Sequence, residues 1–161
     1  MDVYRQYGDP GAPRCGRKKR GQHTEALGRS RGGFGTKIHV AVDGLGNPVE
    51  FRLSGGQEAD VTHAADLIEG HEPEAVVADK AYDSDAFVGE IESRGAKAVI
   101  PPKKNRIESR EVDWHVYKQR NLVERFINRI KRYRRVATRY DKTARNFLAF
   151  VRLAAIMVLL R

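Results

Sequence analysis

The sequence predicts one domain of mixed α/β class, and three observations lead to this prediction. Two alternating apolar stretches around a turn indicate an antiparallel hairpin, two short continuous apolar runs indicate buried strands, and the last third of the chain has helical spacing. Helical segments separate the later strands, and crossovers of that kind place strands parallel. With 161 residues and 40% hydrophobic content, the chain is long enough to bury one core.

The hairpin is expected from Thr36 to Leu53. Its first strand alternates apolar and other side chains, in the order Lys37, Ile38, His39, Val40, Ala41, Val42. The segment Asp43–Pro48 contains two glycines and an asparagine, which supply the turn. The second strand repeats the apolar alternation at Val49, Phe51 and Leu53.

A helix is expected to begin at an Asp60 N-cap and to run through Ile68, because apolar residues recur on one of its sides. The run Ala75–Ala78 has the length and composition of a strand buried on both faces, and Asp79 follows it directly. Asp79 therefore projects at the carboxyl edge of a sheet, where open α/β sheets place their sites. We interpret Asp79 as a candidate metal ligand, with a turn or cap residue as the alternative.

Ser84 or Asp83 is expected to cap the next helix, and we assign Asp83 to capping rather than to chemistry. Residues 96–100 form a further short strand, which two prolines close. Two long helices are expected after it, over about 116–136 and about 143–160. We interpret the second of these as a core helix.

Residues 1–35 are expected to be irregular, because they combine many glycines with a basic cluster at 17–20 and show no hydrophobic period. The folded domain is therefore placed at residues 36–161. Cys15 is the single cysteine, which excludes an internal disulfide and a cysteine-based zinc cluster. The longest apolar run has eight residues, against roughly 20 for a membrane span, so a cytoplasmic protein without membrane partners is expected.

The charge is unevenly distributed along the chain. Residues 1–100 carry 13 Lys and Arg against 16 Asp and Glu, whereas residues 101–161 carry 17 against 5. The last 61 residues therefore have a net charge of +12 within a total of +9. A basic segment of that density attracts polyanions, nucleic acid first, although it could also be a merely solvated face.

A polar stripe runs along the helix that starts near Tyr117. At 100° per residue, five polar side chains fall within roughly 80° on one side of this helix, away from the apolar residues. They are Arg120, Glu124, Asn128, Lys131 and Arg135. Glu124 is thus one carboxylate among cations, and on periodicity alone it could simply be a surface ion-pair partner of Arg120.

The spacing of Tyr117, Arg120, Glu124 and Lys131 is Tyr-x2-Arg-x3-Glu-x6-Lys, and it resembles the Y-R-E-K signature of the insertion-sequence transposases of the IS-four and IS-five groups. Four upstream segments resemble the IS-five type in order and spacing: Gly28–Phe34, Thr36–His39, Asp43–Pro48 and Ala78–Ser84. The resemblance covers residues 16–161.

This resemblance implies a ribonuclease-H-like mixed sheet with flanking helices that cuts and joins DNA at insertion-sequence ends. In such a domain two Asp and one Glu hold two divalent metals, Mg²⁺ or Mn²⁺, which clamp the attacking and leaving oxygens of phosphoryl transfer. It makes Asp79 the second acid and Glu124 the third, both catalytic metal ligands. DNA-backbone contacts are expected from Tyr117, Arg120, Lys131 and Arg135.

The N-terminal residues depart from the family pattern, in which the first acid ends a hydrophobic strand in a run like Asp-Ser-Thr. Asp2 has no strand before it, and Asp9 before a proline reads as a turn. Codons for Val3–Gly16, read one base later, can encode Ile-Asp-Ser-Thr-Val-Ile-Arg-Ala-His-Gln-Asp-Ala-Ala. We therefore hypothesise that residues 1–16 are an out-of-frame translation, with the first central strand missing or degraded.

This chain is therefore expected to be inactive alone. It is part of an active enzyme that frameshifting completes or it is an inert remnant, and we favour the remnant. The alternative is a non-catalytic basic DNA-binding protein, which would need no metal. A junction resolvase is disfavoured by the Tyr-Arg-Glu-Lys spacing. The expected partners are insertion-sequence ends, target DNA and a second copy of the chain, in association with a bacterial nucleoid. Trp114 is expected to be a packing anchor rather than a base-stacking platform.

Overall fold

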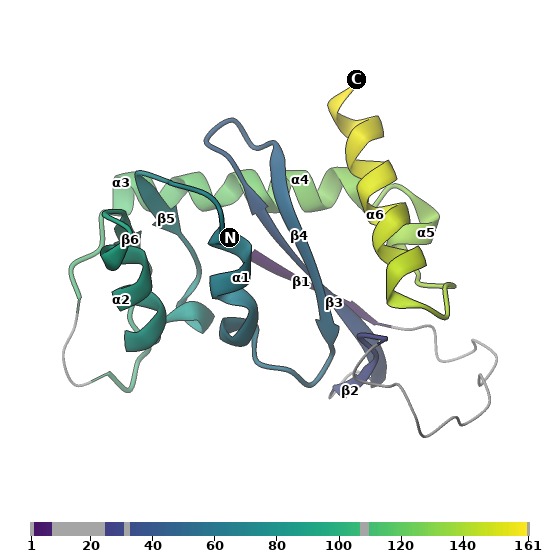
Figure 1. Cartoon of the computed structure of the whole chain (residues 1–161), viewed down its shortest axis with the longest axis horizontal. Coiled ribbons are helices and arrows are strands. Elements are labelled where there is room, and N and C mark those ends of the chain that lie inside the picture. Colours follow the sequence, from purple (N-terminus) through teal and green to yellow (C-terminus); the bar gives the residue numbers. More distant parts are fainter. Residues whose placement is uncertain (1, 8–24, 31–32, 107–109, 161) are drawn as a thin grey trace.

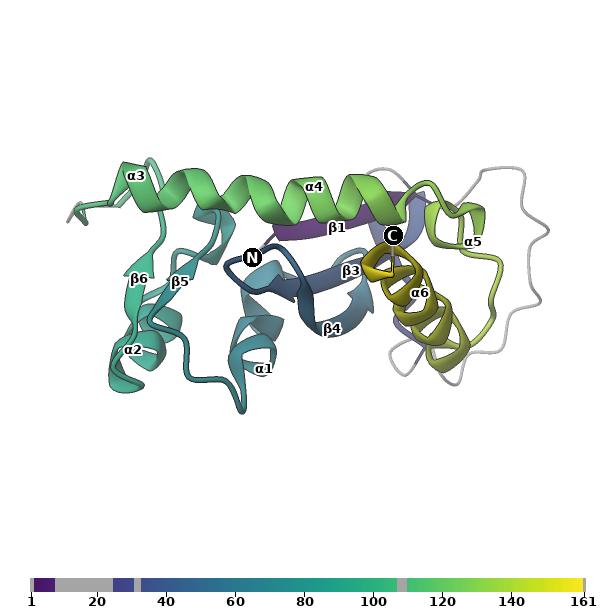
Figure 2. The same ribbon diagram turned by 90° about the horizontal axis from the view of Figure 1, so that it is seen from above.

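The computed structural model describes residues 2–7, 25–30, 33–106 and 110–160. Within these ranges the chain forms a four-stranded sheet, a separate two-stranded sheet and several helices, so the predicted mixed α/β class is confirmed. The four-stranded sheet lies between α4 on one face and α1 on the other, and the two-stranded sheet lies at one end of the molecule (Figures 1 and 2).

The four-stranded sheet is built around β3 (Gly33–Val42), which is the long middle strand. On one side β3 pairs antiparallel with β4 (Pro48–Gly55), which confirms the predicted hairpin. The Asp43 carboxylate accepts hydrogen bonds from Leu45 N and Asn47 N, both at 2.9 Å, and thereby closes the turn between these strands.

The other side of β3 pairs with two strands from the N-terminal part of the chain. They are β1 (Asp2–Tyr7) and β2 (Gly28–Ser30), both antiparallel to β3. The prediction of irregular backbone throughout residues 1–35 is therefore wrong for these two segments, whereas the predicted basic cluster at 17–20 lies outside the described residues. The expectation that the first central strand is missing is corrected in the same way, since β1 pairs with β3 from Asp2 to Tyr7.

The two-stranded sheet consists of β5 (Ala75–Val77) and β6 (Lys97–Val99), which pair in parallel as predicted. The crossover between them contains α2 (Asp85–Ser93), whose first turn is capped by the Ser84 hydroxyl, which accepts from Phe87 N at 3.2 Å. Asp83 does not cap this helix, so its assignment to capping is wrong. In the described part of the chain, β5 and β1 belong to different sheets.

The predicted helix from Asp60 to Ile68 is present as a 3₁₀ turn, η1 (Asp60–His63), followed by α1 (Ala64–Ile68). Asp60 is the first residue of η1 and not its N-cap. Its carboxylate instead lies 2.5 Å from the ammonium group of Lys37 on β3. A long-range ion pair has therefore replaced the predicted local cap.

The C-terminal third contains a long helical rod, a short helix after it, and a last helix that packs against the rod. The rod consists of α3 (Trp114–Tyr117), the 3₁₀ turn η3 (Lys118–Arg120) and α4 (Asn121–Ile130), and it spans both sheets (Figure 2). The short helix α5 (Arg134–Ala137) follows after a break, because Tyr133 has extended backbone with φ −84° and ψ 114°. The prediction of one helix through residue 136 is therefore wrong.

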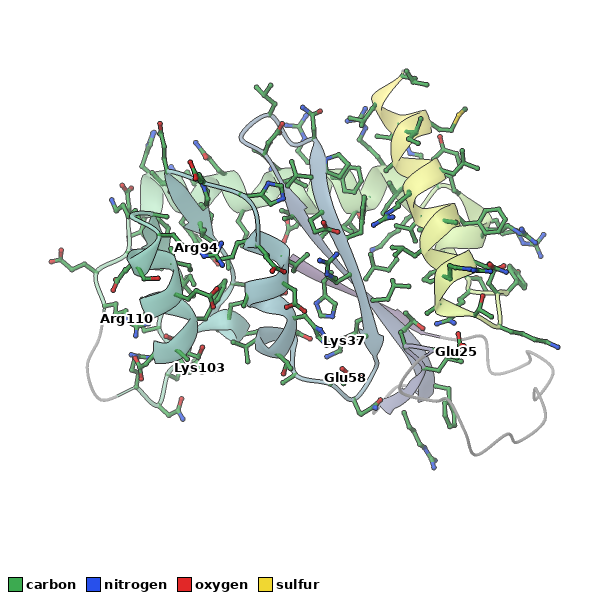
Figure 3. All side chains as sticks on the ribbon, viewed as in Figure 1. Glu25, Lys37, Glu58, Arg94, Lys103 and Arg110 are labelled. Atoms are coloured by element: carbon green, nitrogen blue, oxygen red, sulfur yellow. The ribbon has the colours of Figure 1, made fainter. Side chains whose placement is uncertain are left out.

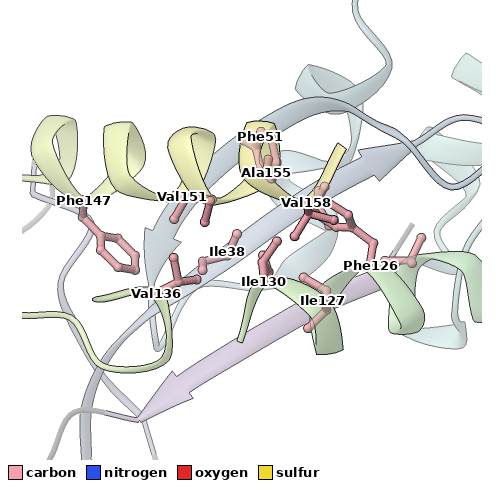
Figure 4. Close-up of a cluster of buried hydrophobic side chains, with 13 residues drawn as sticks. Ile38, Phe51, Phe126, Ile127, Ile130, Val136, Phe147, Val151, Ala155 and Val158 are labelled. Carbon is pink, nitrogen blue, oxygen red and sulfur yellow. The ribbon is translucent and has the colours of Figure 1, made fainter. Parts of the chain in front are cut away.

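The last helix, α6 (Ala144–Leu159), begins after Thr143, whose hydroxyl accepts from Asn146 N at 3.3 Å. Its buried face meets α4 and the strands β3 and β4, so the prediction of a core helix is confirmed (Figure 4). The cluster includes Ile38, Phe51, Phe126, Ile127, Ile130, Val136, Phe147, Val151, Ala155 and Val158. In the described ranges no helix is both long and apolar enough to cross a membrane.

Candidate active site and nucleic-acid interface

Asp79 lies two residues after the end of β5, at the carboxyl end of that strand, and is half-buried. Its Oδ1 accepts a hydrogen bond from Ala81 N at 2.6 Å and so caps the 3₁₀ turn η2 (Lys80–Tyr82). The predicted position at the edge of a sheet is confirmed. The cap that sequence analysis kept as the alternative is also present, so the hydrogen bond from Ala81 N orients the Asp79 carboxylate.

Glu124 lies in the first turn of α4 and is part of a row of side chains along the rod. Its Oε1 is 2.7 Å from Arg120 Nη2, and the Arg120 guanidinium lies 5.9 Å from the centre of the Tyr117 ring. The predicted ion pair of Glu124 with Arg120 is therefore observed, and three residues of the Tyr-Arg-Glu-Lys pattern share one face. The Glu124 side chain is 47% exposed, so this pair contributes little to stability and leaves the carboxylate accessible.

The cationic end of the predicted stripe differs from the sequence expectation. Lys131 is the C-cap residue of α4 and is half-buried, in keeping with its predicted place at the end of the row. Arg135 is on α5, beyond the break at Tyr133, and its guanidinium lies 4.2 Å from the centre of the Phe150 ring. The prediction that Arg135 continues the stripe is wrong, because the helical repeat stops before it.

Trp114 is 62% exposed at the start of α3, and it meets the Tyr117 ring edge-on at a centroid distance of 5.5 Å. The prediction that it is a buried packing anchor is therefore wrong. It lines an open hollow of about 400 Å³ together with Pro102, Arg110, Glu111 and Val112. The row of side chains along the rod, which includes Tyr117, Arg120 and Glu124, is therefore preceded by the exposed ring of Trp114.

Asp83 holds the segment after β6 against the start of α2, a role that sequence analysis did not find. Its side chain is only 1% exposed, and its carboxylate accepts from Lys103 N at 2.8 Å, from Arg106 Nη1 at 2.7 Å and from Arg110 Nη1 at 2.9 Å. Figure 3 shows Lys103 and Arg110 at the α2 end of the molecule. Burial raises the pKa of Asp83, but the hydrogen bonds from Lys103 N and Arg106 outweigh it and bring the pKa below its usual value.

A second polar cluster is buried between β3 and η1, on the face of the sheet that α1 covers. His39 is 0% exposed, and its Nε2 lies 2.7 Å from the Ser54 hydroxyl. The Lys37 ammonium donates to the Glu58 carbonyl and to Asp60 (Figure 3). Burial, and next the nearby His63, lower the pKa of His39 from 6.5 to about 4. His39 is therefore neutral at pH 7. The alternation in the sequence placed Lys37 and His39 on one face of the strand but did not show that η1 and α1 bury this face.

The donor set for a metal ion is incomplete within the described residues. Asp79 and Glu124 offer hard carboxylate oxygens of the kind that Mg²⁺ and Mn²⁺ bind. The described ranges contain no group of three or more His, Cys, Asp or Glu side chains placed to hold a metal ion. The chemistry of the two acids fits a divalent metal, but in the described ranges neither belongs to a three-residue metal-binding group, so the first acid of the family pattern is not identified there.

Comparison with known proteins agrees with the residues described above. The chain matches the family described as "Transposase DDE domain" over residues 11–159. It is 37% identical over 130 residues to a protein named putative transposase for insertion sequence element IS6501 from Brucella ovis (strain ATCC 25840 / 63/290 / NCTC 10512), a match that covers 78% of this chain and 98% of the relative.

A second relative is the putative transposase for insertion sequence element IS402 from Burkholderia cepacia, which is 29% identical over 157 residues. That match covers 90% of this chain and 70% of the relative. No solved structure matches the chain. The family match spans most of the sequence and includes both Asp79 and Glu124, so the chain belongs to the family of transposase DDE domains.

Proposed function

We propose that this chain is the catalytic-domain part of an IS-five-type transposase with a ribonuclease-H-like sheet. The observation that carries the proposal is the face of the rod on which Tyr117, Arg120 and Glu124 follow one another, with Lys131 at the signature spacing. The antiparallel order of β1, β3 and β4, followed by the parallel pair of β5 and β6, supports the ribonuclease-H-like arrangement.

In this proposal Asp79 and Glu124 are the metal-binding acids of strand cleavage and strand transfer. A bound divalent cation would supply charge stabilisation for the phosphoryl group. The η2 cap fixes the Asp79 carboxylate at the end of β5, whereas Arg120 holds Glu124 until a cation competes for it. The Tyr117 hydroxyl and the Arg120 and Lys131 cations are suited to contacts with phosphate oxygens beside the cleaved bond.

We propose that this chain does not cut DNA alone, because no residue of its described ranges supplies the first acid of this set. Within β1, Asp2 is the first residue of the strand and is paired with Val40, rather than following an apolar run. The acid of the shifted reading would straddle Arg5 and Gln6, which lie opposite Lys37 and Thr36. Asp9 lies outside the described residues.

The proposed DNA contacts can be tested by measuring the affinity of the unchanged chain for a DNA duplex. We expect metal-independent binding that weakens steeply with salt, because each phosphate contact contributes about 0.9 to the slope of log affinity against log salt. Arg120→Gln and Lys131→Gln should each lower affinity and reduce the slope by about one contact. Lys142→Gln, at an exposed cation far along the chain, is the matched control. Equal slopes for all three variants would remove the Glu124 face from the DNA interface.

A non-catalytic DNA-binding protein is the second candidate, and the net charge of +12 in the last 61 residues favours it. A cleavage assay distinguishes this candidate from a transposase, because a non-catalytic DNA-binding protein stays inactive even after a complete set of acids is restored. A homodimer is also proposed, since Leu153 and Ile156 on α6 and the C-cap residue Leu160 are exposed, and their spacing of three and four suits packing against a like helix. Sedimentation of the free chain measures its mass and decides this point. Nucleoid association would follow from DNA binding.

A further inference from the structure

A second row of cations lies on the rod, about 120° around its axis from the face that carries Glu124. Lys118, Arg125 and Arg129 lie on the rod and Arg132 follows just after the end of α4; all four are exposed, and we name them the lateral row. At 1.5 Å per residue the lateral row is roughly 21 Å long. In the described part of the chain, no Asp or Glu carboxylate forms an ion pair with any of its members.

The apolar face of α4 packs against α6, and the lateral row reaches α6 only at its far end, through Arg129. Arg129 Nη2 donates to the Val158 carbonyl at 3.1 Å, near the end of α6. This bond fixes one guanidinium and offsets the partial negative charge of the α6 C-terminus. Leu122, which the helical repeat puts on the same side of the rod, lies beside Gly46 in the hairpin turn. By the helical repeat, the lateral row and the Glu124 face therefore point in different directions from the rod.

A cavity of about 410 Å³ opens at the end of the lateral row, between α4 and α6. Its lining residues are Arg129, Arg132, Tyr133 and Val158. Two guanidinium forks and a phenol offer hydrogen-bond donors, and the carbonyl of Val158 is already bound to Arg129. A planar fork of N–H donors matches a phosphate group, whereas it gives no match to an apolar or cationic ligand.

We infer that the lateral row and this cavity bind the sugar-phosphate backbone of a second DNA duplex, distinct from the one on the Glu124 face. The inference rests on the proposed function, since strand transfer joins one DNA end to another DNA and requires both to be held. One duplex lies along Tyr117, Arg120 and Lys131, and the other lies along the lateral row with a phosphate seated between Arg129 and Arg132. The domain then holds the two DNA molecules on two faces of one rod, about 120° apart.

The test counts duplexes per protomer, with the full chain and a short blunt duplex, by native mass spectrometry at low salt. The unchanged chain is expected to bind two duplexes per protomer. The variant Arg125→Gln/Arg132→Gln leaves Arg129 and its bond to α6 in place, so the fold is retained. It should bind one duplex, with the affinity for the second reduced at least tenfold and that for the first changed less than about twofold.

The control Lys142→Gln/Arg145→Gln removes the same charge from exposed cations outside the lateral row and should still bind two duplexes. One duplex per protomer in the unchanged chain, or two in the lateral variant, overturns the inference and leaves the proposed function standing. If Lys131→Gln leaves affinity unchanged while the lateral variant loses all binding, the lateral row is the only DNA surface. That result overturns both the second-duplex inference and the proposed role of the Glu124 face.

Discussion

The buried His39 makes the stability of this protein depend on pH in a defined window. Its pKa is lowered to about 4 in the folded chain, against 6.5 for an exposed histidine. Between these values the unfolded chain takes up a proton at His39 that the folded chain does not, so the free energy of unfolding falls as pH falls. The stabilisation is complete above pH 6.5 and lost towards pH 4. The difference of pKa values corresponds to about 3 kcal/mol.

The groups that face His39 determine how cleanly this effect can be measured. His63 lies at a ring-centroid distance of 5.0 Å, and its Nε2 is 2.9 Å from Glu58. Asp60 and Glu58 raise the pKa of His39, whereas Lys37 and His63 lower it, and burial is the largest cause. Asp83, whose pKa is also lowered, loses its stabilising charge only below the usual carboxylate range, so its contribution falls outside the histidine window.

The assay is urea unfolding at intervals from pH 7 to pH 4.5, for the unchanged chain and for His39→Gln. Glutamine removes the titration and can still donate to the Ser54 hydroxyl, so the comparison concerns slopes and not absolute stability. We expect the unchanged chain to lose roughly 2–3 kcal/mol over this interval and His39→Gln to lose much less. His71→Gln, at an exposed histidine, is the control and should keep the full slope. An equal slope in His39→Gln would refute the assignment of the effect to His39.

Three further substitutions test the local structure by urea unfolding at pH 7. Asp83→Asn removes the charge from a carboxylate that accepts three hydrogen bonds, and it should lower the free energy of unfolding by about 2–3 kcal/mol; a loss below about 0.5 kcal/mol would contradict the buried anchor. Thr143→Ala removes the cap of α6 and should lower it by about 1 kcal/mol, while Thr143→Ser should restore most of that loss. Glu124→Gln breaks a half-exposed ion pair, so a change of less than about 0.5 kcal/mol is expected, and a large change would make Glu124 a structural residue.

Patterns of short range predicted most of the fold. The alternation around Ile38 and Val40 gave the hairpin, the run at Ala75 gave a buried strand, and the spacing of apolar residues gave α6. These predictions held because neighbouring residues in the sequence decide them. The break at Tyr133 was missed because it depends on the backbone of one residue, and the apolar period continues across it to Val136.

Contacts between distant residues explain the other errors. Asp83 was assigned to capping because Ser84 and Asp83 are both good caps, and only the fold brings Arg106 and Arg110 to its carboxylate. Strand β1 was missed because pairing with β3, not local composition, stabilises it. For the candidate site, the family spacing located Glu124, and the sheet edge located Asp79. Neither pattern alone indicates that these two carboxylates bind a metal ion or act in catalysis.

We propose that Asp79 and Glu124 are catalytic acids and that the first acid of the set is missing. The most direct measurement is Mg²⁺-dependent cleavage of labelled insertion-sequence ends by a chain whose residues 3–16 carry the shifted reading with Asp-Ser-Thr. The restored chain should cut these ends, whereas the unaltered chain should not. Asp79→Asn and Glu124→Gln in the restored chain should each abolish cutting and leave DNA affinity within about twofold. If either variant still cuts, the substituted residue is not a catalytic acid. If the unaltered chain cuts in a metal-dependent way, the first acid is not missing.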